Sequence, residues 1–224
     1  METSLHRQLK EIYADDPSQT EITLGDYRID VISGEELVEI QHGSLAAIRD
    51  KVRDLLDHHR VRVVKPVIRR KHLVKQSSRA GSIEHRRLSP KRGSLLDVFD
   101  ELVHFTRVFP HDRLALDVLL VDVEEWRYPG HGRRRRWRAS DQVVEDRRLV
   151  EVVEMHSLQR AVDLRHFVGA RRLPQPFDTR QLATELEVDR PSAQQIAYCF
   201  REMGTTRQVG KRGNALLYEF ADAA

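Results

Sequence analysis

The run YRIDV at residues 27–31, followed after a Ser-Gly-Glu turn by LVEIQ at residues 37–41, decides the expected fold of this chain. Both runs are short, rich in β-branched residues and bounded by turn residues, which predicts the two strands of an antiparallel hairpin. Because side chains alternate between the two faces of a strand, we expect Ile29 and Val31 on an apolar face and Asp30 on the other.

The second strand carries the matching half of this pattern. Val38 and Ile40 share one face, and Glu39 and Gln41 share the other. The hairpin is therefore expected to bring Asp30, Glu39 and Gln41 onto one side of a sheet. Two carboxylates at such a short distance repel each other unless a cation lies between them, and hard oxygen ligands suit Mg²⁺ or Mn²⁺. The alternative is a solvated strand face that carries ordinary surface acids.

Working outward from the hairpin, the hydrophobic periodicity predicts helices and strands in alternation. We expect a helix at 2–14, a strand at 21–25, a helix at 44–59, strands at 61–67 and 72–74, a polar and basic loop at 76–94, a helix at 95–108, strands at 114–126 and 149–153, and a helix at 161–168. This order predicts an α/β (α+β) domain over residues 1–168, with a central sheet flanked by helices, followed by a linker at 169–176.

The C-terminal segment, residues 177–224, predicts two helices and a hairpin. Asp178 and Gln181 have capping-box spacing, and Pro191 suits the first turn of a second helix. The order resembles the winged helix family, which implies contacts with DNA from the second helix and the wing. The residues expected to make them are Gln194, Gln195, Tyr198, Arg201, Lys211 and Arg212. A winged helix used for protein contact is the alternative.

Composition limits the class of protein. The chain has 224 residues with 38 basic and 35 acidic side chains, and its single cysteine, Cys199, excludes an internal disulfide and a cysteine-rich zinc site. The polar N-terminus and the lack of a long apolar run predict a soluble cytoplasmic protein with no membrane partner. No HExxH, Walker A, GxSxG or GxGxxG pattern is present in the sequence. These absences argue against zinc proteases, P-loop NTPases, hydrolase elbows and dinucleotide-binding proteins.

Over residues 1–75, the element order and the acids at 30 and 39 resemble the PD-(D/E)XK, or restriction-endonuclease-like, nuclease superfamily. The resemblance implies that Asp30 and Glu39 bind Mg²⁺ or Mn²⁺, and that Gln41 and an acid on the first helix, Glu2, complete the catalytic set. Glu2 could equally lie at a frayed terminus. The pattern departs from the family where Gln41 replaces the usual lysine, for which Lys10 and His42 are candidate substitutes, and where Ile29 replaces the usual proline.

Basic residues follow the fourth strand, and a second basic run with a tryptophan occupies residues 133–138. Either could follow a nucleic-acid backbone, although the second run suits a solvated hairpin tip as well. The leading hypothesis is a metal-dependent nuclease that hydrolyses phosphodiester bonds in DNA and is positioned by a winged helix, with a homodimer compatible with this arrangement. The rival is a non-catalytic DNA-binding regulator with a degenerate nuclease-like domain.

Overall fold

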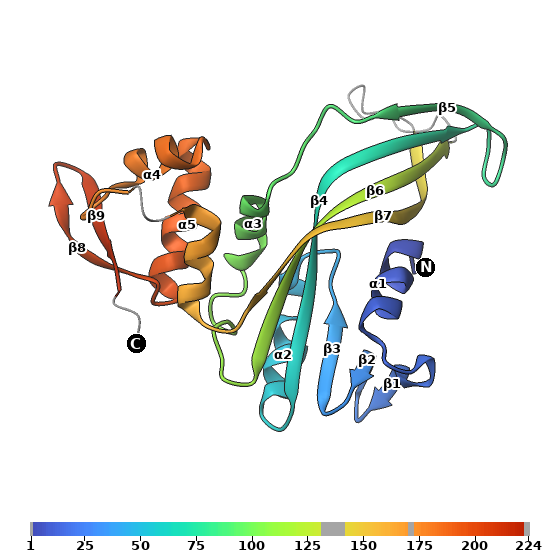
Figure 1. The fold of residues 1–224 in the computed structure, drawn as a ribbon, viewed down its shortest axis with the longest axis horizontal. Coiled ribbons are helices and arrows are strands. Elements are labelled where there is room, and N and C mark those ends of the chain that lie inside the picture. Colours follow the sequence, from blue (N-terminus) through green and yellow to red (C-terminus); the bar gives the residue numbers. More distant parts are fainter. Residues whose placement is uncertain (1, 131–141, 170–172, 222–224) are drawn as a thin grey trace.

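The computed structural model describes residues 2–130, 142–169 and 173–221, and within them a large mixed sheet is flanked by helices (Figure 1). The strand order is β1-β2-β3-β4-β6-β7, with β5 paired to β4. The strands are β1 (Thr20–Leu24), β2 (Tyr27–Ser33), β3 (Glu36–Ile40), β4 (Arg60–Gln76), β5 (Ile83–Leu88), β6 (Leu114–Pro129) and β7 (Gln142–Leu158). The expected α/β (α+β) class is confirmed at this level.

The first half of the sheet positions the candidate acids. β1, β2 and β3 are antiparallel neighbours, and β3 then runs parallel to β4 with Ile40 opposite Val64. A parallel pair needs a crossover connection, which here contains the short helices η2 (Leu45–Ala47) and α2 (Arg49–Leu56). The chain therefore begins with one helix, α1 (Ser4–Tyr13), then three strands, a helical crossover and a fourth strand.

The two faces of the sheet are covered differently. Leu5 and Leu9 of α1 pack with Val31, Val38 and Ile40 in a small apolar cluster. The opposite face belongs to a larger cluster that contains the buried residues of α2 and of α3 (Phe99–Leu102), and that continues into the C-terminal helices. The sheet thus separates α1 from α2 and α3.

Several expected elements differ from those observed. β4 is one strand of 17 residues, and the expected loop at 76–94 contains β5, because β4 continues past residue 67 to pair with both β5 and β6. The expected helix at 95–108 is reduced to η3 (Leu95–Val98) and one turn of α3, after which buried Phe105 and Phe109 hold the chain in turns. Here tertiary packing overrides local periodicity.

The expected helix at 161–168 is the 3₁₀ helix η4 (Ala161–Val168), and the basic run at 133–138 lies outside the described residues.

The C-terminal part forms the expected two helices and hairpin. α4 (Thr179–Leu186) begins with the expected capping box, α5 (Arg190–Glu202) has Pro191 in its first turn, and β8 (Thr206–Arg212) pairs with β9 (Ala215–Phe220). Phe177 adds an isolated bridge to Tyr218 of β9. α5 packs against α3, where the rings of Phe99 and Phe200 lie 5.5 Å apart, edge to face. None of the described helices is long and apolar enough to cross a lipid bilayer.

Candidate functional site

Asp30 lies at an irregularity in β2. Ile29 packs in the large cluster and Val31 in the small one, so the expectation that both share one face is wrong. Strict alternation fails because the Asp30 carboxylate accepts a hydrogen bond from the Ile40 N–H at 2.8 Å and thus takes part in the strand pairing. The other carboxylate oxygen lies 3.0 Å from Nε2 of His6 on α1.

These contacts keep Asp30 ionised. Burial by itself would raise the pKa of Asp30, but the hydrogen bonds from His6 and from the Ile40 N–H outweigh it and leave the pKa below its ordinary value. A carboxylate held in one orientation by a strand and a helix is a preorganised ligand or hydrogen-bond acceptor.

Glu39 is buried on β3, and its side chain is only 6% exposed. Nζ of Lys51, on α2, lies 2.6 Å from Oε1 of Glu39, but within the described residues this oxygen has no hydrogen bond of acceptable geometry. Burial raises the pKa of Glu39 to about 7; the ion pair with Lys51 opposes this rise, and the charge of Asp30 adds to it. The Glu39 carboxylate is therefore under-compensated, and an additional cation would stabilise its charged form.

Gln41 follows Glu39 at the end of β3. Its backbone N–H donates to Val64 of β4 at 2.9 Å, and its side-chain Oε1 accepts from the Gly43 N–H at 3.1 Å. Because β3 and β4 are parallel with Ile40 opposite Val64, Gln41 comes alongside Lys65 of β4. The sheet thus places a lysine next to Gln41, the position at which the resemblance noted from the sequence implies a lysine.

The two cations considered as substitutes for that lysine have other surroundings. His42 is exposed, and partial desolvation together with the nearby positive charges lowers its pKa, which favours the neutral ring. Lys10 is buried, with its ammonium 2.6 Å from Glu2 and in contact with Glu21. Neither is a free cation beside Gln41.

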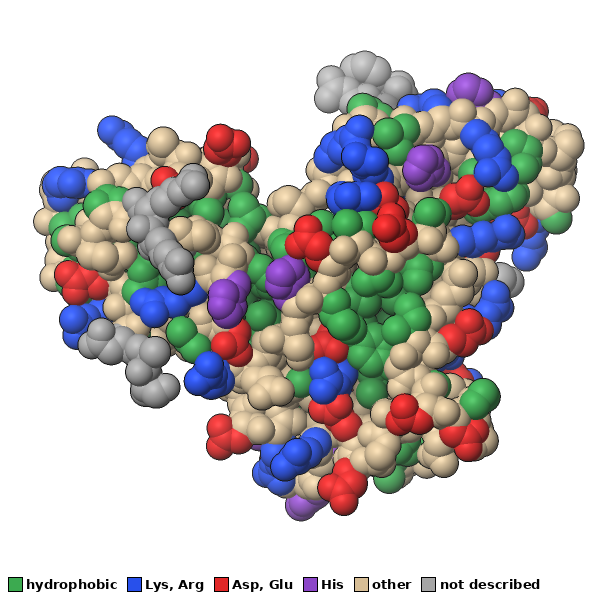
Figure 2. Space-filling view, in the orientation of Figure 1, with side chains coloured by type: hydrophobic (Ala, Val, Ile, Leu, Met, Phe, Trp, Pro, Cys, Tyr) green, Lys and Arg blue, Asp and Glu red, His purple; other side chains and the backbone are tan. Residues whose placement is uncertain are grey.

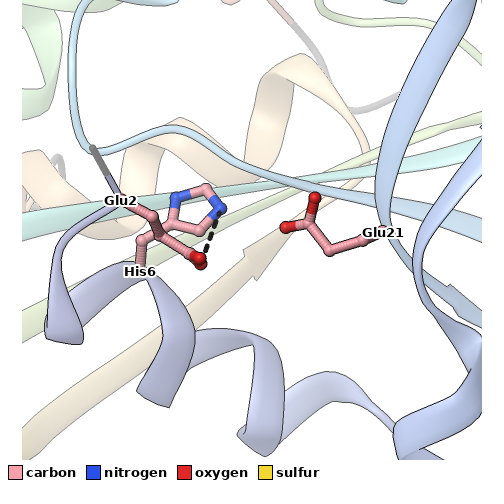
Figure 3. Close-up of side chains that lie close together, drawn as sticks. All are labelled: Glu2, His6 and Glu21. Atoms are coloured by element: carbon pink, nitrogen blue, oxygen red, sulfur yellow. Dashed lines mark ion pairs between the residues drawn. The ribbon is translucent and has the colours of Figure 1, made fainter.

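Glu2 precedes α1, whose N-cap is Thr3, so its expected place on the helix stripe is wrong. Its carboxylate nevertheless turns back toward the helix and lies 3.9 Å from His6 (Figure 3). Ligand atoms of Glu2, His6 and Glu21 all lie within 4.8 Å of one another. The ammonium of Lys10 contacts both of these glutamates, which makes the cluster an ion-pair network with its cation already supplied.

Glu21 has an unusual backbone. It lies in β1 with a φ of 59°, a conformation that side chains rarely adopt, and Thr20 and Ile22 on either side of it pair with Val31 and Ile29. Glu21 is therefore opposite Asp30, and such strain commonly collects at functional sites. Sequence reasoning missed Glu21, for which no signal exists, and also His6 and Lys51, whose helical positions facing the acids could have been considered.

The expected DNA contacts of the C-terminal part are only partly on a free surface. Gln194, Tyr198 and Arg201 form an exposed stripe along α5, with the guanidinium of Arg201 5.6 Å from the Tyr198 ring. Gln195 is a correction, because its side chain donates to the Phe99 carbonyl of α3 at 2.9 Å.

The two cations at the tip of the β8–β9 hairpin also differ from each other. Lys211 is exposed. Arg212 contacts the carboxylate of Asp178 and lies 3.1 Å from Gln181, at the start of α4. Lys211 is therefore exposed to solvent at this tip, whereas Arg212 connects the hairpin to the start of α4.

Comparisons with known proteins identify the family to which most of this chain is similar. A domain described as a domain of unknown function (DUF8091) matches residues 3–159. An uncharacterized protein of Treponema pallidum (strain Nichols) is 32% identical over 152 residues, which cover 67% of this chain and 59% of that protein. The chain thus spans less than two thirds of the length of this relative. No solved structure matches the chain.

Proposed function

We propose that this chain, which belongs to the DUF8091 family, is a divalent-metal-dependent nuclease that cleaves phosphodiester bonds in DNA. The observation that carries the proposal is a pair of acids, half-buried Asp30 and buried Glu39, on neighbouring strands of a unit made of a helix, three strands, a helix and a strand. This order and these acids agree with the restriction-endonuclease-like pattern.

The donor set fits a hard divalent cation. Asp30 offers an ionised carboxylate, and Glu39 offers a buried carboxylate whose only close cation is Lys51 among the described residues. Asp30 and Glu39 would hold Mg²⁺ or Mn²⁺, which when bound would lower the pKa of a water and neutralise charge on the phosphate. His6 would act as a positioning residue, because it fixes the Asp30 carboxylate at 3.0 Å.

The remaining residues of the chain supply orientation and charge. Gln41, two residues after Glu39 and directly after β3, would hydrogen-bond the attacking water or a phosphate oxygen through its side-chain amide. Lys51 neutralises Glu39 from α2 and would stabilise negative charge that develops on the phosphate once the carboxylate is shared with a metal.

The C-terminal part would position the nuclease. We infer that α4, α5 and the β8–β9 hairpin act as a winged helix, with Gln194, Tyr198 and Arg201 facing base edges and Lys211 facing phosphates. The same exposed stripe, together with glutamine at position 41, supports the second candidate, a DNA-binding regulator without catalysis.

Cleavage of labelled single-stranded and duplex DNA, with RNA as a parallel substrate, tests the proposal. Cleavage should require Mg²⁺ or Mn²⁺ and should fall about 100-fold or more in Asp30→Asn and Glu39→Gln. Glu36→Gln is the matched control, because it makes the same change three residues earlier on β3, where Glu36 pairs with Arg62. Retained cleavage in both site variants would refute the site, and DNA binding without any cleavage would favour the regulator.

A further inference from the structure

A cleft of about 420 Å³ lies between β4 and the segment that leads through η3 into α3. Lys65 of β4 lines this cleft, and the same lysine lies alongside Gln41, the residue that follows β3. Val63 and Val67 of β4 pack in the large cluster, so by alternation Lys65 is on the same face of the sheet as Glu39 and Gln41. The cleft therefore opens on the same face of the sheet as Glu39 and Gln41, whereas Asp30 contacts His6 on the α1 side.

Lys65 is the most buried of the cations that line this cleft. Its side chain is 6% exposed, and it donates one hydrogen bond, to the carbonyl of Gly43. The nearest carboxylate oxygen, on Glu101, is 3.8 Å away. An ammonium has three N–H donors, so Lys65 retains donors for a partner in the cleft. A buried ammonium with so few partners favours an anion beside it.

The wall opposite β4 is firmly held. The backbone N–H of Ser89 donates to Lys71 at 2.8 Å, and that of Gly93 donates to Arg69 at 3.1 Å. Gly93 approaches β4 so closely that a Cβ there would lie 2.2 Å from the Ile68 carbonyl oxygen. Hydrogen bonds and close packing thus fix the shape of the cleft, and a side chain at position 93 would not fit.

Charge is distributed unequally over the walls. Lys71 and Arg127 also line the cleft but pair with Glu125, whereas Lys91 makes no ion pair within the part of the chain that the structure describes. Asp97, Asp100 and Glu101 contribute carboxylates on the side of η3 and α3. An anion near Lys65 and hydrogen-bond donors near the carboxylates would satisfy both walls. A nucleotide has both, because its phosphate is an anion and its base amino groups are donors.

Outside the cleft, Lys and Arg side chains also gather where β4, β5, β6 and β7 extend beyond the rest of the sheet, at the upper right of Figure 2. Arg70 and Arg87 are exposed there. A nucleic-acid strand would find favourable charge on its approach to the cleft.

We propose that this cleft is a phosphate subsite for the nucleic-acid strand, in which Lys65 binds the backbone phosphate next to the one that is cleaved. The assignment rests on the proposed nuclease function for the identity of the strand. Lys91 contacts the same phosphate from the rim, and the carboxylates of Asp97 and Asp100 accept hydrogen bonds from the base.

Binding of fluorescently labelled hexadeoxyadenylate, whose bases carry amino groups, to the full chain in EDTA tests this subsite without any cleavage. Lys65→Met should weaken binding about 10-fold or more, because a buried charged hydrogen bond is lost without loss of volume. Lys91→Met, at the exposed rim, should weaken it about threefold. Arg53→Met is the control, because Arg53 is exposed on α2, outside the cleft and outside the basic extension of the sheet, and pairs with Asp50.

Competition by inorganic phosphate tests the subsite independently of the proposed nuclease function. Phosphate should displace the hexanucleotide from the wild-type chain and should no longer compete in Lys65→Met. Wild-type affinity for both probes in a folded Lys65→Met protein would overturn the proposal. If Lys65→Met fails to fold, unchanged binding in Lys91→Met together with no competition by phosphate would overturn it as well. Subsite binding with no cleavage under any condition would support the subsite and count against the nuclease.

Discussion

Two buried glutamates on the same sheet, Glu39 of β3 and Glu125 of β6, have opposite electrostatic surroundings. Glu125 is 1% exposed and lies 2.8 Å from Nζ of Lys71 and 3.0 Å from Nε of Arg147, and it also contacts Arg127. Burial opposes ionisation, but these hydrogen bonds outweigh it and lower the pKa of Glu125 to about 2.

Glu39 is nearly as buried but has one cationic partner, and its pKa is raised to about 7. The difference shows that the number of well-placed donors decides the charge of a buried acid, since burial is nearly the same. Glu125 is complete within the chain, whereas Glu39 retains a deficit of positive charge that a metal would fill.

The largest expected difference between the two is in stability. Glu125→Gln should lower the free energy of unfolding by about 3 kcal/mol, because it leaves several cations around a buried neutral side chain. Glu39→Gln should change it by less than about 1 kcal/mol at pH 8, because it removes an under-compensated buried charge and leaves Lys51 bound to the Arg28 carbonyl. Denaturant unfolding of both variants measures this contrast, and equal losses would break it.

A smaller effect is expected in the pH dependence of stability. Glu39 has a pKa of about 7 in the folded chain and 4.5 as its ordinary value, so between these limits the folded state binds more protons than the unfolded state. The free energy of unfolding should therefore fall as pH rises from about 4.5 to about 7, by up to roughly 3 kcal/mol from this group.

Glu39→Gln supplies the control for this pH effect. The fall should be reduced in this variant relative to the wild type, whereas Glu125 titrates below the range and contributes nothing to it. Parallel stability profiles of the wild type and Glu39→Gln between pH 4.5 and 8 would contradict the assigned surroundings of Glu39.

The sequence was informative where local patterns dominate. The alternation of Val38 and Ile40 correctly predicted their shared apolar face, and the Asp178–Gln181 capping box correctly predicted the start of α4. It was uninformative where a side chain replaces a backbone partner, since the Asp30 carboxylate that accepts from Ile40 breaks the alternation of β2.

Contacts between distant segments were also beyond the sequence patterns. Gln195 lies on the helix at the right spacing for an exposed amide, but α3 covers it, and that packing depends on the whole fold. The pairing of Lys51 with Glu39 and the placement of Lys65 beside Gln41 depend on the crossover from β3 to β4. Sequence spacing does not encode such neighbours.

Calorimetric titration of the full chain with Mn²⁺ tests the central claim most directly, namely that the deficit at Glu39 is a metal site. The account predicts that the wild type and Glu125→Gln bind Mn²⁺ with similar affinity, and that Asp30→Asn and Glu39→Gln lose at least about 10-fold in affinity while remaining folded. Absence of binding by the wild type, or equal binding by Glu39→Gln, would contradict it.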